Sequence, residues 1–181
     1  PVTTVSYTTR DGLQIKGVLT LPKGRNPRNL PLVLLPHGGP EARDLERFDW
    51  WVQFLAWRGY AVFQPNYRGS TGFGTKFQKL GDGEWGLKMQ DDLNDAVSFL
   101  AGNGTIDPKR VCIAGASYGG YAALRAAQRD GTMYRCAISY AGVSDLPGML
   151  RYDRQFLNGR SMAAVWNKAT ANIRDVSPLR H

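Results

Sequence analysis

Hydrophobic and polar residues follow two different periods along this chain, and the change between them predicts both strands and helices. Two alternating runs flank Asp11-Gly12 between Tyr7 and Leu21, which is a strong signal for a β-hairpin. The wholly apolar run at 32–35 predicts a strand buried on both faces. Further runs predict strands at 60–63, 110–114 and 136–140.

Between these runs, apolar residues recur at helical spacing. Two stripes carry the pattern, the first closing at Gly59 and the second before Gly102: Leu45, Phe48, Val52 and Leu55, then Met89, Leu93, Ala96, Val97 and Leu100. The alanine-rich segment 121–128 predicts a third helix, whereas the long, glycine-rich segment 65–86 predicts a functional or packed surface loop. From Arg151 onward we find helical fragments and no strand-like run.

Strand and helix alternate after the opening hairpin, and this order favours a mostly parallel sheet with helices on both faces. A chain of 181 residues holds one domain with a real core and hardly two. We therefore expect a single α/β domain over residues 1–181. The first residue is proline rather than methionine, so we expect the chain to be a piece of a longer protein.

The composition is that of an ordinary globular protein, with 43% hydrophobic and 21% charged residues, and it excludes disorder, collagen-like repeats and coiled coil. No apolar run approaches the ~18 residues of a membrane span, and no leader-like segment opens the chain. We therefore expect no membrane partner and a cytoplasmic protein. Cys112 and Cys136 lie in apolar predicted strands, and we expect both to be buried free thiols.

The formal net charge is +8, and residues 151–181 carry much of the excess. The basic residues are dispersed, and they belong to no known nucleic-acid-binding module, so we expect no nucleic-acid partner. Two interpretations of the excess stay open: a solvated face, or a face that meets a partner segment.

The segment Gly115-Ala-Ser117-Tyr118-Gly119 has the form Gly-x-Ser-x-Gly. It follows a predicted buried strand and opens a predicted helix, which is the context of a nucleophile elbow. The tight turn presents the serine hydroxyl at the end of the strand, and the helix N-terminus adds positive partial charge. The backbone N–H of Tyr118 can then face a developing oxyanion. The alternative is that Ser117 is merely a small residue in a glycine-rich turn.

A second glycine-rich turn, His37-Gly38-Gly39-Pro40, directly follows the buried run 32–35. In α/β-hydrolases this loop supplies the second oxyanion donor, and we expect that donor to be the Gly39 N–H, with Gly38 as the alternative. In those enzymes the chain order is serine, acid, histidine. His37 precedes Ser117, so we expect it to hold the loop by hydrogen bonds rather than to act as the base.

Other motifs favour structural roles. The segment 81–86 has the form Gly-x-Gly-x-x-Gly but follows no apolar strand, so a dinucleotide site is not expected. Arg68 is expected to hold the glycine-rich loop by hydrogen bonds. Asp91, Asp92 and Asp95 fall at a helix start, where carboxylates favour the helix dipole, and we expect no metal or other cofactor.

The combined motifs resemble the catalytic domain of the prolyl oligopeptidase family of serine peptidases, in its acylaminoacyl-peptidase and dipeptidyl-peptidase-like branch. The resemblance covers nearly the whole chain and is carried by segments 37–40, 63–74, 86–97, 106–111, 115–122 and 177–181. It implies an α/β-hydrolase fold in which Ser117 is the acyl-forming nucleophile and Tyr118 and Gly39 are backbone oxyanion donors. It also implies short peptide or acyl-peptide substrates, no cofactor, and a β-propeller that this chain lacks.

A serine nucleophile needs a histidine base and an acid to orient it. After Ser117 the chain holds one histidine, His181, and the carboxylates Asp145, Asp153 and Asp175. Residues 151–181 offer no strand that could carry His181 to the serine, and the resemblance implies that the family's acid lies further on, so we expect a C-terminally truncated domain. Asp145 is expected in a turn or cap.

Truncation implies that the isolated chain is inactive and that it exposes a sheet edge through which it can self-associate. Two alternatives stay open, a carboxylesterase-like acyl hydrolase and a noncatalytic fragment acting only by association.

Overall fold

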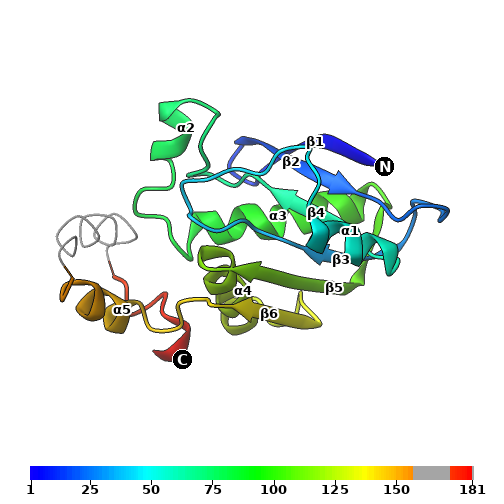
Figure 1. Ribbon diagram of the computed structural model, residues 1–181. Coiled ribbons are helices and arrows are strands. Elements are labelled where there is room, and N and C mark those ends of the chain that lie inside the picture. The colour runs from blue at the N-terminus through cyan, green and yellow to red at the C-terminus, as the bar shows by residue number, and fades with distance from the viewer. Residues whose placement is uncertain (157–171, 181) are drawn as a thin grey trace.

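The computed structural model describes residues 1–156 and 172–180, and it shows one twisted sheet with helices on both faces (Figure 1). Its strands are β1 (Val2–Thr8), β2 (Gln14–Thr20), β3 (Leu30–Leu34), β4 (Ala61–Pro65), β5 (Ile106–Ala116) and β6 (Cys136–Tyr140). They lie in the order β1-β2-β4-β3-β5-β6. β4, β3, β5 and β6 are parallel, while β1 and β2 form an antiparallel hairpin joined to β4. The predicted α/β class, with its N-terminal hairpin and mostly parallel sheet, is confirmed.

The helices are α1 (Trp50–Trp57), α2 (Thr75–Lys79), α3 (Lys88–Gly102), α4 (Tyr118–Arg129) and α5 (Leu146–Asp153), with a short 3-10 helix, η1 (Pro178–Arg180). α3 and α4 cover one face of the sheet and α1 the other (Figure 1). Successive residues of the buried run 32–35 pack against opposite faces of the sheet. Leu32 and Leu34 join the core with α3 and α4, whereas Val33 packs with Val52 of α1.

Two boundaries differ from the sequence pattern. α1 begins at Trp50, because the Asp49 carboxylate accepts a hydrogen bond from Val52 N at 3.2 Å and caps the first turn. Leu45 and Phe48, expected on this helix, lie in the loop before it and are 47% and 80% exposed. The segment 65–86, expected as a loop, contains the short helix α2.

The prediction that Cys112 and Cys136 are buried free thiols is wrong. They form a disulfide, and their Cα atoms lie 4.7 Å apart. The parallel register of β5 and β6 places the two residues directly opposite each other, and Cys136 lies on an exposed edge. The position of Cys136 opposite Cys112 and its exposure both follow from how the strands pair, which the residues around each cysteine do not reveal.

β6 is the last strand of the sheet within the described ranges, and it pairs only with β5. Its side chains on the α1 side are open to solvent: Ile138 is 57% and Tyr140 64% exposed. An edge strand that is paired on one side only and carries exposed apolar side chains tends to associate with other chains unless something covers it. Of the helices described, none is long and apolar enough to cross a bilayer.

Candidate active site

Ser117 is the single residue between β5 and α4, and its backbone is held in a conformation that few residues other than glycine adopt. Its φ is 55° and its ψ is −118°. Backbone hydrogen bonds fix this geometry, because Ser117 N donates to Tyr140 O at 3.0 Å and Ser117 O accepts from Tyr121 N at 2.9 Å. The residue is exposed, and its hydroxyl makes no hydrogen bond to any residue that the structure describes.

Glycines around Ser117 let the strand, the helix and the neighbouring loop crowd together. A Cβ on Gly115 would lie 2.5 Å from the Gly119 carbonyl carbon, and one on Gly119 would overlap the Pro36 carbonyl oxygen. Gly120 similarly packs against Gly142, at 2.8 Å from a Cβ position to its Cα. The glycines of the motif are therefore required by close backbone packing.

The predicted oxyanion loop lies beside the elbow. A Cβ on Gly38 would be 3.4 Å from the Cβ of Ser117, and Gly39 is exposed with a φ of 121° and a cis peptide bond to Pro40. Tyr118 is the first residue of α4, where the N–H has no carbonyl partner within its own helix. The fold thus brings the loop, the hydroxyl and the helix N-terminus to one edge of the sheet.

His37 holds this loop, as expected. Its Nδ1 lies 2.8 Å from Gly38 O and its Nε2 lies 2.9 Å from the Ser70 hydroxyl. The ring stacks on Tyr67 at 4.4 Å, and the Tyr67 hydroxyl donates to His37 O at 2.7 Å. Burial lowers the pKa of His37 to about 4, against the opposing effect of Gly38 O. The imidazole is neutral at pH 7 and already occupied on both nitrogens, so it does not serve Ser117 as a base.

Arg68 holds the glycine-rich loop in place, also as expected. Its side chain is 5% exposed, and its guanidinium forms ion pairs with Asp92 at 2.6 Å and Asp11 at 2.9 Å. The Arg68 backbone N–H donates to the Asp92 carboxylate at 2.9 Å. Burial raises the pKa of Asp92 to about 6, and the Arg68 hydrogen bonds oppose that shift. Tyr67 and Ser70 lie on either side of Arg68 in the chain. The Arg68–Asp92 ion pair therefore also fixes the two residues that contact His37.

The depth of Asp92 was not foreseen from the sequence. It is fully buried, whereas the sequence places it with Asp91 and Asp95 at a helix start and does not distinguish the three. A signal existed, because Asp92 lies three residues after Met89 and four before Ala96, on the apolar stripe. Asp91 and Asp95 form surface pairs with Arg129 and Arg10. Throughout residues 1–156 and 172–180, no cluster of three or more His, Cys, Asp or Glu residues could hold a metal ion.

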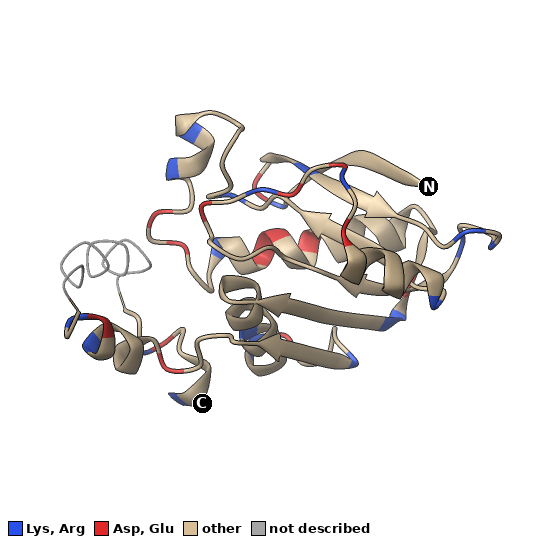
Figure 2. Cartoon of the chain, in the orientation of Figure 1, with Lys and Arg blue, Asp and Glu red and all other residues tan. Residues whose placement is uncertain are grey.

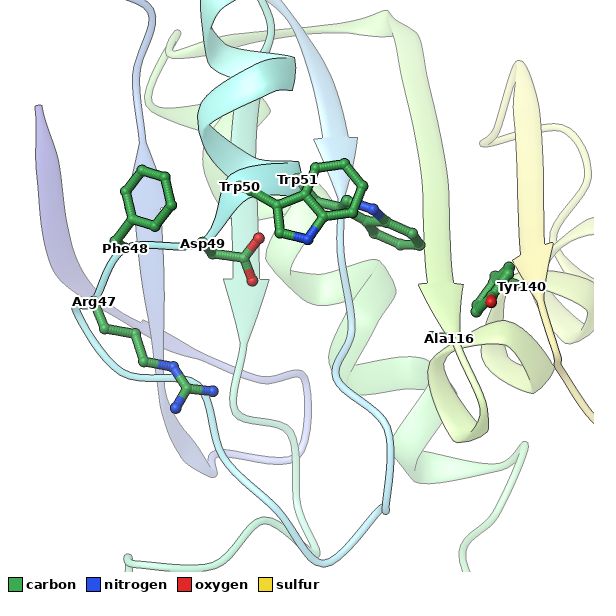
Figure 3. A pocket seen from close by; sticks show the side chains of 7 residues that line it. All are labelled: Arg47, Phe48, Asp49, Trp50, Trp51, Ala116 and Tyr140. Atoms are coloured by element: carbon green, nitrogen blue, oxygen red, sulfur yellow. The ribbon is translucent and has the colours of Figure 1, made fainter.

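A hollow of about 690 Å³ opens next to the elbow (Figure 3). Its lining comes from the start of α1, the loop before it and the ends of β5 and β6: Arg47, Phe48, Asp49, Trp50, Trp51, Ala116 and Tyr140. Figure 3 shows the tryptophans on one side and Tyr140 beyond Ala116 on the other. Trp51 and Tyr140 meet edge to face at 6.1 Å. Trp50 and Trp51 are therefore the described tryptophans that line this space.

A smaller hollow of about 150 Å³ lies behind the oxyanion loop, between Gly38, Ala116 and Asp44. Asp44 accepts a hydrogen bond from Gln64 Nε2 at 3.1 Å, while its Oδ2 is buried and has no partner among the described residues. Burial, and then the charge of Asp49, raise the pKa of Asp44 to about 6. This carboxyl is therefore ready to take up a proton in mildly acidic solution.

Among the described residues that follow Ser117, the carboxylates of Asp145 and Asp175 pair with groups other than histidine. Asp145 occupies the N-cap position of α5, as expected for a turn or cap, and lies 3.4 Å from Arg180. Asp175 accepts a hydrogen bond from Asn172 at 2.6 Å. His181 lies outside the described residues. The described part of the chain therefore contains the turn predicted as a nucleophile elbow and the loop predicted to supply an oxyanion donor, and within it no histidine is free to act as a base for Ser117.

Comparison with known proteins agrees with this geometry. The model of the prolyl oligopeptidase family matches residues 46–181. Dipeptidyl aminopeptidase BIII of Pseudoxanthomonas mexicana is 42% identical over 153 residues, which is 81% of this chain and 22% of that protein. The human acylamino-acid-releasing enzyme is 30% identical over 141 residues, covering 77% of this chain and 19% of that protein.

The fold is similar to that of a solved puromycin hydrolase, with a TM-score of 0.88 and 27% sequence identity. The similarity covers 99% of this chain and 28% of that one. The chain thus spans about a fifth of the length of the curated relatives it matches.

Proposed function

The chain belongs to the prolyl oligopeptidase family, and from this premise we propose that it is the nucleophile-bearing part of a serine peptidase acting on short or N-acylated peptides. One observation carries the proposal more than any other. An exposed serine is held at a φ of 55° between a buried parallel strand and a helix N-terminus, with its hydroxyl unengaged by the described residues. Storing strain at a reactive residue is characteristic of nucleophile elbows.

In the proposed reaction, the Ser117 oxygen attacks the carbonyl carbon of the scissile bond while a base takes the hydroxyl proton. The carbonyl oxygen becomes an oxyanion that faces the N–H groups of Tyr118 and Gly39, and the N-terminus of α4 stabilises its charge. The C–N bond then breaks, and the amine leaves with the proton held by the base. Water attacks the resulting ester, releases the carboxylic acid and restores Ser117.

The base and its orienting acid come, in this proposal, from a segment that follows the described residues. His37 is committed to the oxyanion loop, and the chain's other histidine is His181. We propose that this segment packs in the hollow beside Ala116. The aromatic side chains that line the hollow and the open edge of β6 lie on the same side of the sheet, so one segment could contact both. Without the segment, we expect the chain to be inactive, since loss of a triad member costs several orders of magnitude in rate.

An active-site probe tests the nucleophile. We expect a fluorophosphonate to label the chain slowly or not at all when it is alone, and to label it readily when a downstream segment carrying the histidine is supplied. Ser117→Ala should abolish labelling, whereas Ser98→Ala, at a serine whose hydroxyl bonds within α3, should leave labelling unchanged. Labelling that persists in Ser117→Ala would show that the nucleophile lies elsewhere.

Substrate class needs a separate comparison. With the completed domain, turnover of peptide anilides and nitrophenyl esters can be measured side by side. The proposal expects the ratio of kcat/KM to favour peptide anilides and N-acylated peptides. A domain that cleaves only the esters would instead be a carboxylesterase-like acyl hydrolase, and one that labels under no condition would be a noncatalytic fragment.

A further inference from the structure

The edge of the sheet farthest from Ser117 gathers exposed basic side chains. Because β3, β4, β5 and β6 are parallel, their N-terminal ends share one edge, and Ser117 follows β5 at the other. We call the first edge the basic rim and define it as residues 23–29, 57–59, 103–110 and 135. Figure 2 shows its blue segments along one side of the molecule. Its bases are all exposed: Lys23, Arg25, Arg28, Arg58, Lys109, Arg110 and Arg135.

Contacts between the segments make the rim one continuous surface. The Arg25 guanidinium lies over Gly59, 3.1 Å from the position that a Cβ would take there. Arg110 Nη2 donates to Asn29 O at 2.5 Å, and Arg135 Nε donates to Lys109 O at 3.1 Å. Side chains from four separate parts of the sequence are thereby fixed next to one another.

The rim carries almost no compensating negative charge. Its one acidic residue is Asp107, whose carboxylate accepts hydrogen bonds from Lys109 N and from Arg110 Nε at 2.8 Å. These bonds lower the pKa of Asp107 and keep it ionised. Elsewhere on the rim, no base forms an ion pair with any described residue. Six positive charges therefore face solvent together, and their mutual repulsion is relieved when an anionic partner binds.

We propose that the basic rim is a docking surface for an acidic segment or face of a partner protein. Five of its seven bases are arginines, whose planar guanidinium matches a carboxylate with two parallel hydrogen bonds. Residues 23–29 are all exposed, and this loop projects beyond the sheet at the right of Figure 1. A projecting basic loop fits a concave acidic surface better than a flat one.

The composition of the rim argues against two other anionic partners. Docking on a bilayer requires several apolar side chains that insert among the lipids, and single-stranded nucleic acid requires successive aromatic platforms. Trp57 is the rim's one aromatic residue, 76% exposed, and the Arg58 guanidinium lies 5.8 Å from its ring centroid. Phe54, just outside the rim, is 54% exposed, and its ring centroid lies 6.3 Å from that of Trp57. This single aromatic cluster supplies neither a row of base-stacking platforms nor a broad insertion surface, whereas it suits the anchor of a protein interface.

Docking at the rim leaves the candidate active site free. Leu30 and Leu34 of β3 pair with Ile106 and Ile113 of β5, so these two β5 residues lie only four strand steps apart, and Ala116 lies three steps further. At ~3.3 Å per step, the two edges lie roughly 23 Å apart. A partner bound to the rim would hold the protein in place without blocking access to Ser117. The inference is therefore independent of the proposed peptidase activity and is tested without a substrate.

The test uses the full chain and a fluorescein-labelled peptide of ten glutamates, followed by fluorescence anisotropy. We expect saturable binding that weakens about tenfold between 50 and 300 mM NaCl, because screening shortens the range of charge interactions. The triple variant Arg25→Glu, Arg28→Glu, Lys109→Glu should lose binding by at least about tenfold. The matched control Lys76→Glu, Lys79→Glu, Lys88→Glu makes the same change in net charge outside the rim and should retain binding. Arg25→Gln with Arg28→Gln, confined to the exposed loop, serves if the triple variant unfolds.

Equal loss in the rim variant and the control would overturn the proposal, because binding would then follow net charge alone. The partner class is tested in parallel with vesicles containing 30% phosphatidylserine and with a 20-nucleotide single strand. Tighter, rim-dependent binding to either of these than to the acidic peptide would also overturn it. Circular dichroism confirms that each variant is folded.

Discussion

The close approach of α4 to the oxyanion loop makes Gly119→Ala the most informative single substitution. The added methyl group would overlap the Pro36 carbonyl oxygen and lie 3.1 Å from the Pro36 carbonyl carbon and 3.3 Å from His37 O. All three are backbone atoms, which cannot rotate aside as a side chain can. Either the first turn of α4 or the oxyanion loop must therefore move.

The magnitude follows from two opposing effects. Overpacking in a rigid site costs about 1–3 kcal/mol, and a contact this short against backbone belongs at the upper end. Alanine in place of glycine within a helix stabilises the folded state by up to about 1 kcal/mol, which opposes this cost. The net loss is about 2 kcal/mol, which for a domain of this size lowers Tm by roughly 4–8 °C.

Urea unfolding followed by circular dichroism measures this loss, and Gly102→Ala in α3 is the matched control. No atom lies within 4 Å of a Cβ placed on Gly102, so that variant should be neutral or slightly more stable. The fluorophosphonate labelling rate of the completed domain should fall in Gly119→Ala, because the elbow and the loop are displaced relative to each other. Equal unfolding midpoints for the two variants would refute the packing argument.

Three further predictions concern groups outside the elbow. Arg68→Met should lower the free energy of unfolding in urea by about 3–5 kcal/mol, because it leaves the Asp92 charge buried without its partner. The double variant with Asp92→Leu should recover much of this loss, and no recovery would contradict the pairing. Asp44 has a folded-state pKa near 6, above its unfolded value, so it should add up to about 2 kcal/mol to the unfolding free energy as pH falls from 7 to 4. Asp44→Asn should remove that increment, and an unchanged pH profile would contradict the assignment. Reducing the Cys112–Cys136 bridge, which joins residues 24 apart, should lower stability by about 3 kcal/mol; a urea midpoint insensitive to dithiothreitol would show that the bridge does not form.

The strand, turn and helix around Ser117 could be predicted from the sequence because they depend on local backbone geometry. A strand, a Gly-x-Ser-x-Gly turn and a helix in succession place Ser117 at the end of β5, and the contacts with Tyr140 and Pro36 then hold the turn. The buried runs and the hairpin at Asp11-Gly12 likewise depend on short-range patterns, and their elements lie where they were expected. The structural role of His37 followed from chain order alone.

The remaining features depend on which segments meet, and this information is not local. The bridge between Cys112 and Cys136 needs the register of two parallel strands, and the burial of Asp92 needs Arg68 to arrive from a loop 24 residues earlier. The basic rim draws on bases that lie far apart in the sequence and gather only because parallel strands begin at one edge. Sequence by itself determined the turn at Ser117 and the alternation of strands and helices, because steric and hydrophobic preferences act over a few residues. Only the tertiary structure decided the ion pairs, the disulfide and the basic rim. Each of these needs residues from separate segments to lie within a few ångströms of one another, and the sheet alone brings those segments together.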